Sequence, residues 1–367
     1  MKYPLIKVDV GEAELAEIKR VLESGYIAQG PTTRRYSEEF AAFTGARHAS
    51  AVSSCTAGLH LSIVVLNIGE GDEVIVPSFT YPATANVVEL ERARTVFADI
   101  DLQTFNIDVN ALEELITEKT KAIMPVHEFG LSADMGPLMK LAEKHGLRVI
   151  EDAAPSIGTY YGKKHVGTIG DFGCFSSHPR KILTTGEGGM VTTENEALYL
   201  KIESLKSHGI VPGNLMEFER YGFNYRMSDI LAAVGLAQLK KLKSTLAKRR
   251  ELALNYTTLL EGTEGIRPPV EMNYGNHTFQ SYVTLLNDGI DRDKVIALLK
   301  EKEIQTQIGT FAVHSLPPYR NHEADCPNAL TAYKQTLTLP LYNELVESDQ
   351  EFIVKELRKA IENARRS

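Results

Sequence analysis

The chain has 367 residues, of which 43% are hydrophobic and 24% charged, and its formal net charge is −8 at pH 7. This composition is that of an ordinary globular protein of about two domains, and the negative charge disfavours broad binding to nucleic acid or to a membrane surface. The three cysteines are widely spaced, without a CxxC pair, so neither a disulfide framework nor a metal site is expected. The longest apolar run, residues 59–69, is about half of a membrane span, so we expect a soluble protein of the reducing cytoplasm.

Predicted helices and strands alternate through the first half of the chain. This alternation implies parallel βαβ units in an open, doubly wound α/β sheet. The apolar spacing and the turn residues predict helices over 12–25, 56–69, 83–92 and 136–146, and strands over 48–54, 72–78, 94–100, 121–126, 147–153, 171–177 and 188–194.

Residues 228–262 have the spacing of one long helix or of two joined helices, and their Lys/Arg run is typical of a solvated face. Shorter strand and helix patterns follow and suggest a smaller α+β domain. We therefore predict a large domain over 1–245 and a small C-terminal domain over 246–367.

Polar side chains follow several of the predicted strands at their carboxyl ends, where open α/β sheets bind ligands. They are the "SSCTAG" run at 53–58, Tyr81, His127, Glu151, Asp152, Ser176, Ser177 and Lys181. Each has an ordinary structural interpretation: "SSCTAG" is a good helix N-cap, Tyr81 a packing residue and His127 a hydrogen-bonded core histidine. Asp152 ends an apolar strand, so it needs a positive partner or several donors.

One ligand accounts for these strand ends together. A helix start for a phosphate, an aromatic ring, a buried carboxylate and the Lys181 amine are the groups that pyridoxal 5′-phosphate requires. A carboxylate about 4 Å from the pyridine nitrogen contributes on the order of 4 kcal/mol, or about three pKa units, which keeps the ring protonated. No Walker A loop, GxGxxG, GxSxG or HExxH motif is found, which disfavours the other common α/β enzyme classes.

Seven segments in order resemble the DegT-type sugar aminotransferases over nearly the whole chain. They are "AVSSCTAGLHLS", "GDEVIVPSFTYPATAN", "VFADIDLQTFNID", "VIEDAAPSIG", "GTIGDFGCFSSHPRKILTTGEGGMVTT", "GFNYRMSDILAAVGLAQL" and "CPNA…LTLPLY". The resemblance implies a fold-type-I pyridoxal-phosphate enzyme, with a mostly parallel seven-stranded sheet flanked by helices and a smaller C-terminal α+β domain.

The resemblance also implies the roles of single residues. Lys181 would link covalently to the cofactor and move protons, while Asp152 would pair with the pyridine nitrogen. Tyr81 and Ala154 would lie on the two faces of the ring. The phosphate would be held by Thr56, Ala57 and Ser176, and by Asn224 of a second copy, which makes the expected active unit a homodimer.

Three positions depart from the family pattern, all near the expected substrate pocket. Cys55 stands where glycine is frequent, and Pro155 stands where glutamine is frequent, so a side-chain contact near the cofactor is expected to be missing. A histidine that many members carry five residues before His314 is absent. Lys181 itself favours transamination, because a dehydratase branch of the family has histidine there.

We therefore expect an aminotransferase that moves nitrogen from an amino acid, with glutamate as the expected donor, to a 3- or 4-keto sugar linked to a nucleoside diphosphate. Arg180 and Lys163 are candidate charges for the pyrophosphate, although a plain surface role fits both. Two alternatives stay open: a non-nucleotide cyclic ketone as the substrate, and a cofactor-binding regulatory protein without turnover.

Overall fold

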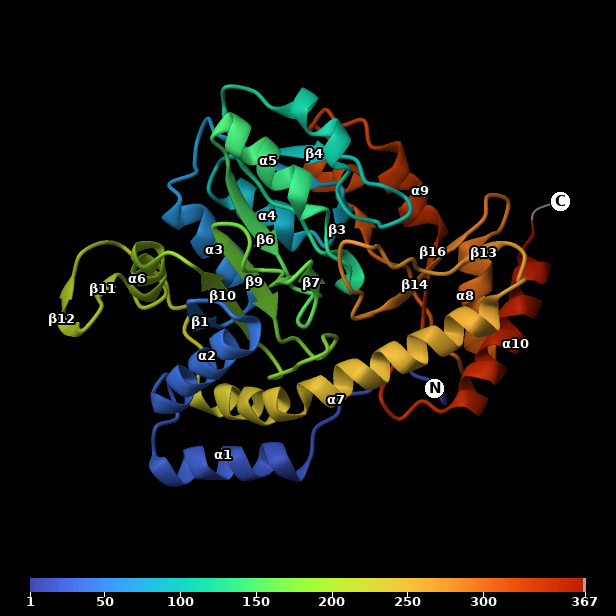
Figure 1. Ribbon diagram of the computed structural model, residues 1–367, viewed down its shortest axis with the longest axis horizontal. Helices are drawn as coiled ribbons and strands as arrows, with labels where there is room; N and C mark the ends of the chain where they lie inside the picture. The colour runs from blue at the N-terminus through green and yellow to red at the C-terminus, as the bar shows by residue number, and fades with distance from the viewer. Residues whose placement is uncertain (366–367) are drawn as a thin grey trace.

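A seven-stranded sheet forms the centre of the computed structural model, which describes residues 1–365 (Figure 1). Its strand order is β1-β10-β9-β6-β5-β2-β4, and all neighbours from β9 to β4 are parallel, whereas β10 runs antiparallel to both β1 and β9. The mostly parallel seven-stranded sheet is thereby confirmed. The strands are β1 (His48–Val52), β2 (Glu73–Pro77), β4 (Arg94–Ala98), β5 (Thr120–Ile123), β6 (Arg148–Asp152), β9 (Phe172–Ser176) and β10 (Gly189–Thr193).

Successive strand residues enter two different apolar cores, which is why the strands read as continuous apolar runs. In β2, Val74 and Val76 pack with α3 (Cys55–Val65), α4 (Ala83–Leu90) and α6 (Glu196–Leu205) on one face. Ile75 packs on the other face with α5 (Met135–His145). The sheet is therefore a middle layer between two layers of helices, and this packing fixes the positions of its strand ends.

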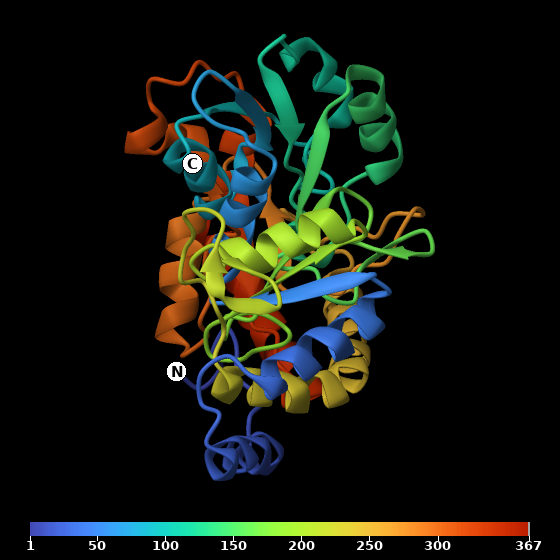
Figure 2. The same ribbon diagram turned by 90° about the vertical axis from the view of Figure 1, so that its left-hand side faces the viewer.

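The region between residues 228 and 262 is one helix rather than two. This helix, α7 (Asp229–Leu260), begins beside α1 (Glu12–Ser24) and α2 (Pro31–Thr44) and extends to the second part of the molecule (Figure 1). Figure 2 shows α6 in front of the sheet, with α1, α2 and α7 gathered below. The predicted domain boundary at residue 245 lies inside this continuous helix and stays a prediction.

The second part of the molecule has its own apolar core around a three-stranded antiparallel sheet, in the order β13-β14-β16. Its elements are β13 (Ile266–Arg267), β14 (Tyr282–Leu286), β16 (Thr336–Leu339), α8 (Arg292–Glu301) and α10 (Glu347–Ala364). The predicted smaller α+β unit is thus present, and it packs against the carboxyl-end side of the large sheet through β15 (Phe311–Ala312), which pairs with β3 (Phe79–Thr80).

Several elements were not expected from the sequence. They are α2, α6, α9 (Pro327–Gln335), the hairpin of β7 (Tyr160–Tyr161) and β8 (Lys164–His165), and the hairpin of β11 (Ile210–Val211) and β12 (Asn214–Phe218). The last of these projects from the body at the left of Figure 1. Within residues 1–365, none of the helices combines the length and the apolar character needed to span a membrane.

Candidate active site

A cavity of about 470 Å³ lies at the carboxyl ends of the large sheet. Asp152 and Lys181 both line this cavity. They have to do so if a single ligand is to contact both side chains. Of the eight predicted site residues, six contribute to the wall: Thr56, Tyr81, Asp152, Ala154, Ser176 and Lys181. Ala57 and Asn224 do not.

Asp152 is held at the end of β6 with 5% of its surface exposed. Its Oδ2 accepts a hydrogen bond from the Thr84 hydroxyl at 2.8 Å, and its Oδ1 accepts one from the Ala154 N–H at 3.1 Å. Burial outweighs these donors and the Lys181 charge, so the pKa of the Asp152 carboxyl lies above its usual value. A cation placed against this carboxylate would lower its pKa again. A protonated pyridine nitrogen is such a cation.

Lys181 lies in the loop between β9 and β10, where its N–H donates to the His178 carbonyl at 2.8 Å. Burial lowers the pKa of its ammonium group, and the negative charge of Asp152 opposes that shift only in part. A lowered pKa leaves more of the amine unprotonated at neutral pH, and the unprotonated amine is the form that attacks an aldehyde.

Hydroxyl groups fix the loop that carries Lys181. The Thr184 hydroxyl donates to the Ser177 carbonyl at 3.0 Å, and the Ser177 and Thr185 hydroxyls lie 2.6 Å apart. Ser177 is buried in these contacts and does not line the cavity, unlike its neighbour Ser176. The loop is therefore a hydrogen-bonded platform rather than a basic surface turn.

The glycines that follow Lys181 bring β10 against the start of α3. A Cβ on Gly189 would lie 2.5 Å from the backbone nitrogen of Cys55, and Gly188 has a φ of 152°. Only glycine permits both the close approach and that backbone conformation. The short glycine-rich stretch therefore sets the distance between the Lys181 loop and the start of α3.

The start of α3, where we expect the phosphate, has an ordinary N-cap. Ser54 is the N-cap residue and accepts from the Ala57 N–H at 3.1 Å, so that donor is already used within the helix. Cys55 and Thr56 line the cavity instead. Burial raises the pKa of the Cys55 thiol well above its usual value, so this side chain is a neutral wall residue. The phosphate role of Ala57 stays a prediction.

Three of the predicted site residues, Tyr81, Asn224 and Thr56, are exposed. The Tyr81 side chain is 66% exposed, with its ring centroid 6.3 Å from that of Phe311. Asn224 lies in the segment before α7, bridged to Ser207, and is outside the cavity of its own chain. This position is compatible with a role toward a second copy, and that role stays a prediction. Among the candidate charges for a pyrophosphate, Arg180 lines the cavity, whereas the exposed Lys163 does not.

His127 is a hydrogen-bonded core histidine, as its ordinary interpretation predicts. Its Nδ1 accepts from the Ala133 N–H at 3.1 Å, so the proton is on Nε2, which lies 3.0 Å from Glu151 Oε2. Glu151 also accepts from the N–H groups of Gly167, Ile169 and Gly170. Burial alone would raise the pKa of Glu151, but these donors hold it below its usual value. Neither side chain faces the cavity.

The neighbouring Glu128, which the sequence analysis passed over, lines the cavity and is 5% exposed. Burial and the nearby Asp152 charge raise the pKa of its carboxyl to about 8. Glu128 begins the short helical turn Glu128–Gly130, and its side chain lies on the cavity wall whereas that of the neighbouring His127 does not. No local pattern of the sequence signals this placement.

Other wall residues come from distant parts of the chain. Thr84 follows Tyr81 by three residues, and an uncharged polar wall of Gln280, Ser281, Gln307 and Thr310 comes from the second part of the molecule. Gln280 Nε2 donates to the Arg180 carbonyl at 2.7 Å and so ties that wall to the Lys181 loop. Sequence patterns carry no signal for this wall, because its residues approach only after the small sheet packs on the large one.

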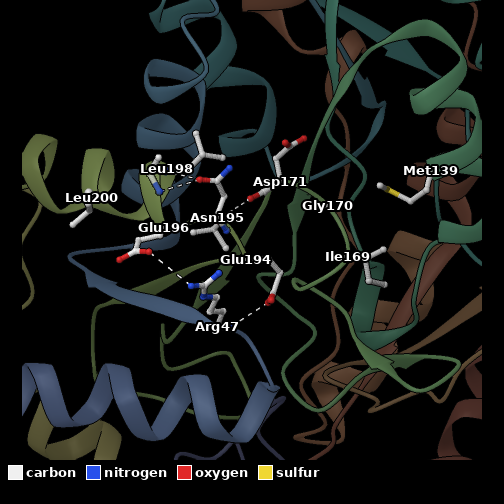
Figure 3. Close-up of a pocket in the computed structure, with 12 residues that line it drawn as sticks. Arg47, Met139, Ile169, Gly170, Asp171, Glu194, Asn195, Glu196, Leu198 and Leu200 are labelled. Atoms are coloured by element: carbon white, nitrogen blue, oxygen red, sulfur yellow. Dashed lines mark hydrogen bonds and ion pairs between the residues drawn. The ribbon is translucent and has the colours of Figure 1, made fainter.

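A second cavity, of about 830 Å³, lies near the opposite ends of β9 and β10 (Figure 3). Its polar groups are already paired with one another. Arg47 contacts Glu194 through its N–H at 3.0 Å and Glu196 through its guanidinium at 3.7 Å, and Asn195 caps α6. Because the amino ends of the parallel strands β6 and β9 point toward this cavity, it is a poorer ligand site than the Lys181 cavity.

The donor set of the Lys181 cavity fits pyridoxal 5′-phosphate. An amine with a lowered pKa and a buried carboxylate line one space, and the capped start of α3 and the Ser176 hydroxyl border it. Lys181 and Asp152 would hold the reactive carbon and the ring nitrogen, and Thr56 and Ser176 the phosphate.

Comparison with known proteins agrees with this site. The family model described as the DegT/DnrJ/EryC1/StrS aminotransferase family matches residues 8–358. The chain is 39% identical to spore coat polysaccharide biosynthesis protein SpsC of Bacillus subtilis, over 97% of this chain and 96% of SpsC. It is 40% identical to GDP-perosamine synthase of Caulobacter vibrioides, over 89% of each chain.

The fold is shared with a solved structure as well. The putative sugar aminotransferase Spr1654 from Streptococcus pneumoniae, in its PLP form, superposes with a TM-score of 0.93 at 29% identity, over 98% of this chain and 99% of that chain. A PMP form of the same protein matches equally well, with a TM-score of 0.93. The chain therefore belongs to the DegT/DnrJ/EryC1/StrS aminotransferase family and is an aminotransferase that depends on pyridoxal 5′-phosphate.

Proposed function

We propose that this enzyme transfers an amino group from an amino acid, with glutamate as the donor, to the ketone at C3 or C4 of a sugar linked to a nucleoside diphosphate. The observation that carries the aminotransferase assignment is the shared cavity of Lys181 and Asp152. The sugar part rests on relatives whose names refer to sugars, GDP-perosamine synthase and Spr1654 among them. The products are a 2-oxo acid and an amino sugar, so the nitrogen balances over two half-reactions.

The uncharged polar wall from the second part of the molecule supports a polyhydroxylated substrate. Gln307, Ser281 and Thr310 offer uncharged donors and acceptors, which suit hydroxyl groups of a sugar. Among the described residues that line the cavity, Arg180 is the only arginine, and its side chain is exposed. It is the candidate for the pyrophosphate or for the donor's carboxylate.

Lys181 and Asp152 would divide the chemical work. Bound pyridoxal phosphate supplies an aldehyde that carries the amino group and a ring that withdraws electrons. Lys181 Nζ would take a proton from the donor's carbon in the first half-reaction and give a proton to the sugar carbon in the second. Its lowered pKa leaves more of the amine unprotonated and able to act as a base. The Asp152 carboxylate keeps a positive charge on the ring nitrogen.

The direct test uses the purified protein loaded with pyridoxal phosphate. It should be yellow, glutamate should bleach the yellow band, and a keto-sugar nucleotide should restore it. Restoration only by free cyclic ketones would replace the nucleotide-sugar assignment. A yellow protein that no amino donor bleaches would favour a regulatory role without turnover.

Lys181→Ala tests the role of the lysine. The variant should fold and bind the cofactor without the yellow lysine-linked band, and turnover should be lost. Exposed Lys163→Ala is the matched control and should keep both band and turnover. Near-normal rates in the Lys181 variant would refute the assignment.

We further propose that the active unit is a homodimer in which Asn224 of one copy reaches the phosphate site of the other. Asn224 is exposed and outside its own cavity, and the nearby β11–β12 hairpin and the segment after it expose Met216, Phe218 and Tyr221 by 90%, 61% and 100%. A second copy is the occupant that would cover this apolar projection and complete the site at once.

Mixing two inactive variants tests this arrangement. A Lys181→Ala chain combined with an Asn224→Ala chain forms heterodimers in which one site has both an intact lysine and an intact partner asparagine. Equal mixing and two-fold symmetry predict about a quarter of the wild-type activity. If both residues act within one chain, mixing restores nothing.

The three buried free cysteines are consistent with our proposal of a reducing cytoplasmic location.

A further inference from the structure

The Glu128 carboxyl is a buried acid of the cavity wall that the reaction described above does not use. It follows β5, and its backbone N–H donates to Asn106 Oδ1 at 2.9 Å, which fixes the turn Glu128–Gly130. The Phe129 backbone in this turn has a φ of 54°. The backbone of this turn thus has a defined conformation, and the Glu128 side chain lies on the cavity wall.

The position of Glu128 in the sheet order places it opposite the phosphate site. β6, which carries Asp152, lies between β9 and β5. The phosphate-site candidates Thr56 and Ser176 come from the ends of β1 and β9, on one side of Asp152. Glu128 comes from the end of β5, on the other side.

The arrangement of groups on the cofactor ring would bring its hydroxyl to the side where Glu128 lies. In pyridoxal phosphate the phosphate-bearing carbon and the carbon that carries the ring hydroxyl flank the aldehyde carbon on opposite sides. With the ring nitrogen at Asp152 and the phosphate on the β9 side, the hydroxyl edge faces β5. Pro155 also lines the cavity, but its side chain has no donor and cannot supply a hydrogen bond to this hydroxyl.

We propose that Glu128, in its protonated form, donates a hydrogen bond to the ring hydroxyl oxygen of the cofactor. The proposal rests on the assignment of Lys181 and Asp152 above. An ionised Glu128 would repel both that oxygen and the Asp152 carboxylate, whereas a neutral carboxylic acid is a donor.

The protonation of Glu128 is consistent with its surroundings. Burial is the main reason that the pKa of its carboxyl is raised to about 8, and the Asp152 charge adds to the effect, while Lys181 and a hydrogen bond with Thr80 oppose it. His277, which lines a small cavity behind Glu128, is held neutral because burial lowers its pKa to about 3. A carboxyl has two oxygens, so the Thr80 contact leaves one for the ligand.

This donor affects the proton that Lys181 Nζ carries when it is linked to the cofactor. The ring oxygen attracts that proton, and a hydrogen bond from Glu128 draws part of the oxygen's negative charge away. Removing the donor should therefore raise the pKa of Lys181 Nζ in the loaded enzyme. A hydrogen bond to a charged oxygen corresponds to about one pKa unit, or about tenfold in proton affinity.

The experiment is a pH titration of the yellow band in the loaded wild type and variants. Glu128→Leu should raise the midpoint by about one unit, whereas Glu128→Gln keeps an N–H donor and should stay near the wild type. Glu187→Leu is the matched control, because Glu187 is an exposed glutamate on the Lys181-loop side of the same cavity and should not shift the midpoint. If Glu128→Leu fails to fold, Glu128→Met replaces it.

A second readout does not involve Lys181. The probe 4-deoxypyridoxine 5′-phosphate has the ring hydroxyl but cannot link to a lysine, and it should bind the Glu128→Leu apoprotein about tenfold more weakly than wild type or Glu128→Gln. If Glu128→Leu changes neither the midpoint nor the binding of the probe, the proposal is overturned. A variant whose only change is a higher KM for the sugar would also overturn it. A missing yellow band in the wild type would instead overturn the Lys181 assignment.

Discussion

The hydroxyl of Thr84, near the start of α4, donates a 2.8 Å hydrogen bond to Oδ2 of Asp152 at the end of β6. Thr84 is fully buried, and its hydroxyl also lies 3.2 Å from that of Thr80. Asp152, which we propose faces the ring nitrogen, is therefore oriented by a helix that follows a different strand. Thr84 acts through Asp152 and is a positioning residue.

Thr84→Val should lower kcat/KM by about ten- to a hundredfold, because a hydrogen bond to a charged group contributes about 1.5–3 kcal/mol. Thr84→Ser restores the donor and should recover most of the loss. The pH profile separates positioning from simple packing. Without this donor the pKa of Asp152 rises, so the acidic limb of the profile should move to higher pH. A lower Tm with an unmoved limb would argue for packing alone.

Asp152→Asn should reduce turnover by about a thousandfold, since the carboxylate contributes on the order of 4 kcal/mol to keeping the ring nitrogen charged. The amide keeps the size of the side chain and a hydrogen bond with Thr84, so some cofactor should remain bound. Single-turnover rates with glutamate, normalised to bound cofactor, provide the measurement. An Asn variant with near-normal rates would contradict the role given to Asp152.

Asp229→Ala should destabilise the protein by about 3–5 kcal/mol. Asp229 caps α2 from 199 residues away, because its carboxylate accepts from the N–H groups of Gly30, Thr32 and Thr33 at 2.7, 3.0 and 2.9 Å. The N-cap residue Gly30 has no side chain for this task. Asn195→Ala, which removes an exposed cap of α6, is the control and should cost about 1 kcal/mol. Equal losses in urea unfolding would contradict the long-range cap.

Glu128 also gives the apoprotein a specific pH dependence. Its carboxyl has a pKa of about 8 when folded, above the usual 4.5, so the folded state binds more protons between these values. Stability from this group is fully present below about pH 4.5 and is lost as the pH rises through about 8. Glu128→Gln removes this loss, so its stability relative to wild type should increase by a few kcal/mol from pH 5 to pH 8.5. Parallel pH profiles of the two apoproteins would show that Glu128 is not protonated in the fold.

The sequence was sufficient for the large sheet because its strands are short apolar runs separated by helices with clear stop signals. It failed for α2, whose helix start is capped by Asp229 and whose first helical residue, Pro31, follows a glycine rather than a polar cap. It also gave no sign of Glu128, whose side chain lines the cavity next to the core residue His127. Both errors have the same origin, since the deciding partners lie far away in the chain.

By itself the sequence determined which strand ends carry an amine, an acid and a capped helix start, because those features depend on neighbours within a few residues. Only the tertiary structure decided which of two neighbouring side chains, such as His127 and Glu128, faces the cavity. It also decided which hydroxyl orients Asp152 and which polar groups from the second part of the molecule line the site. Those outcomes follow from packing between segments that no local pattern connects.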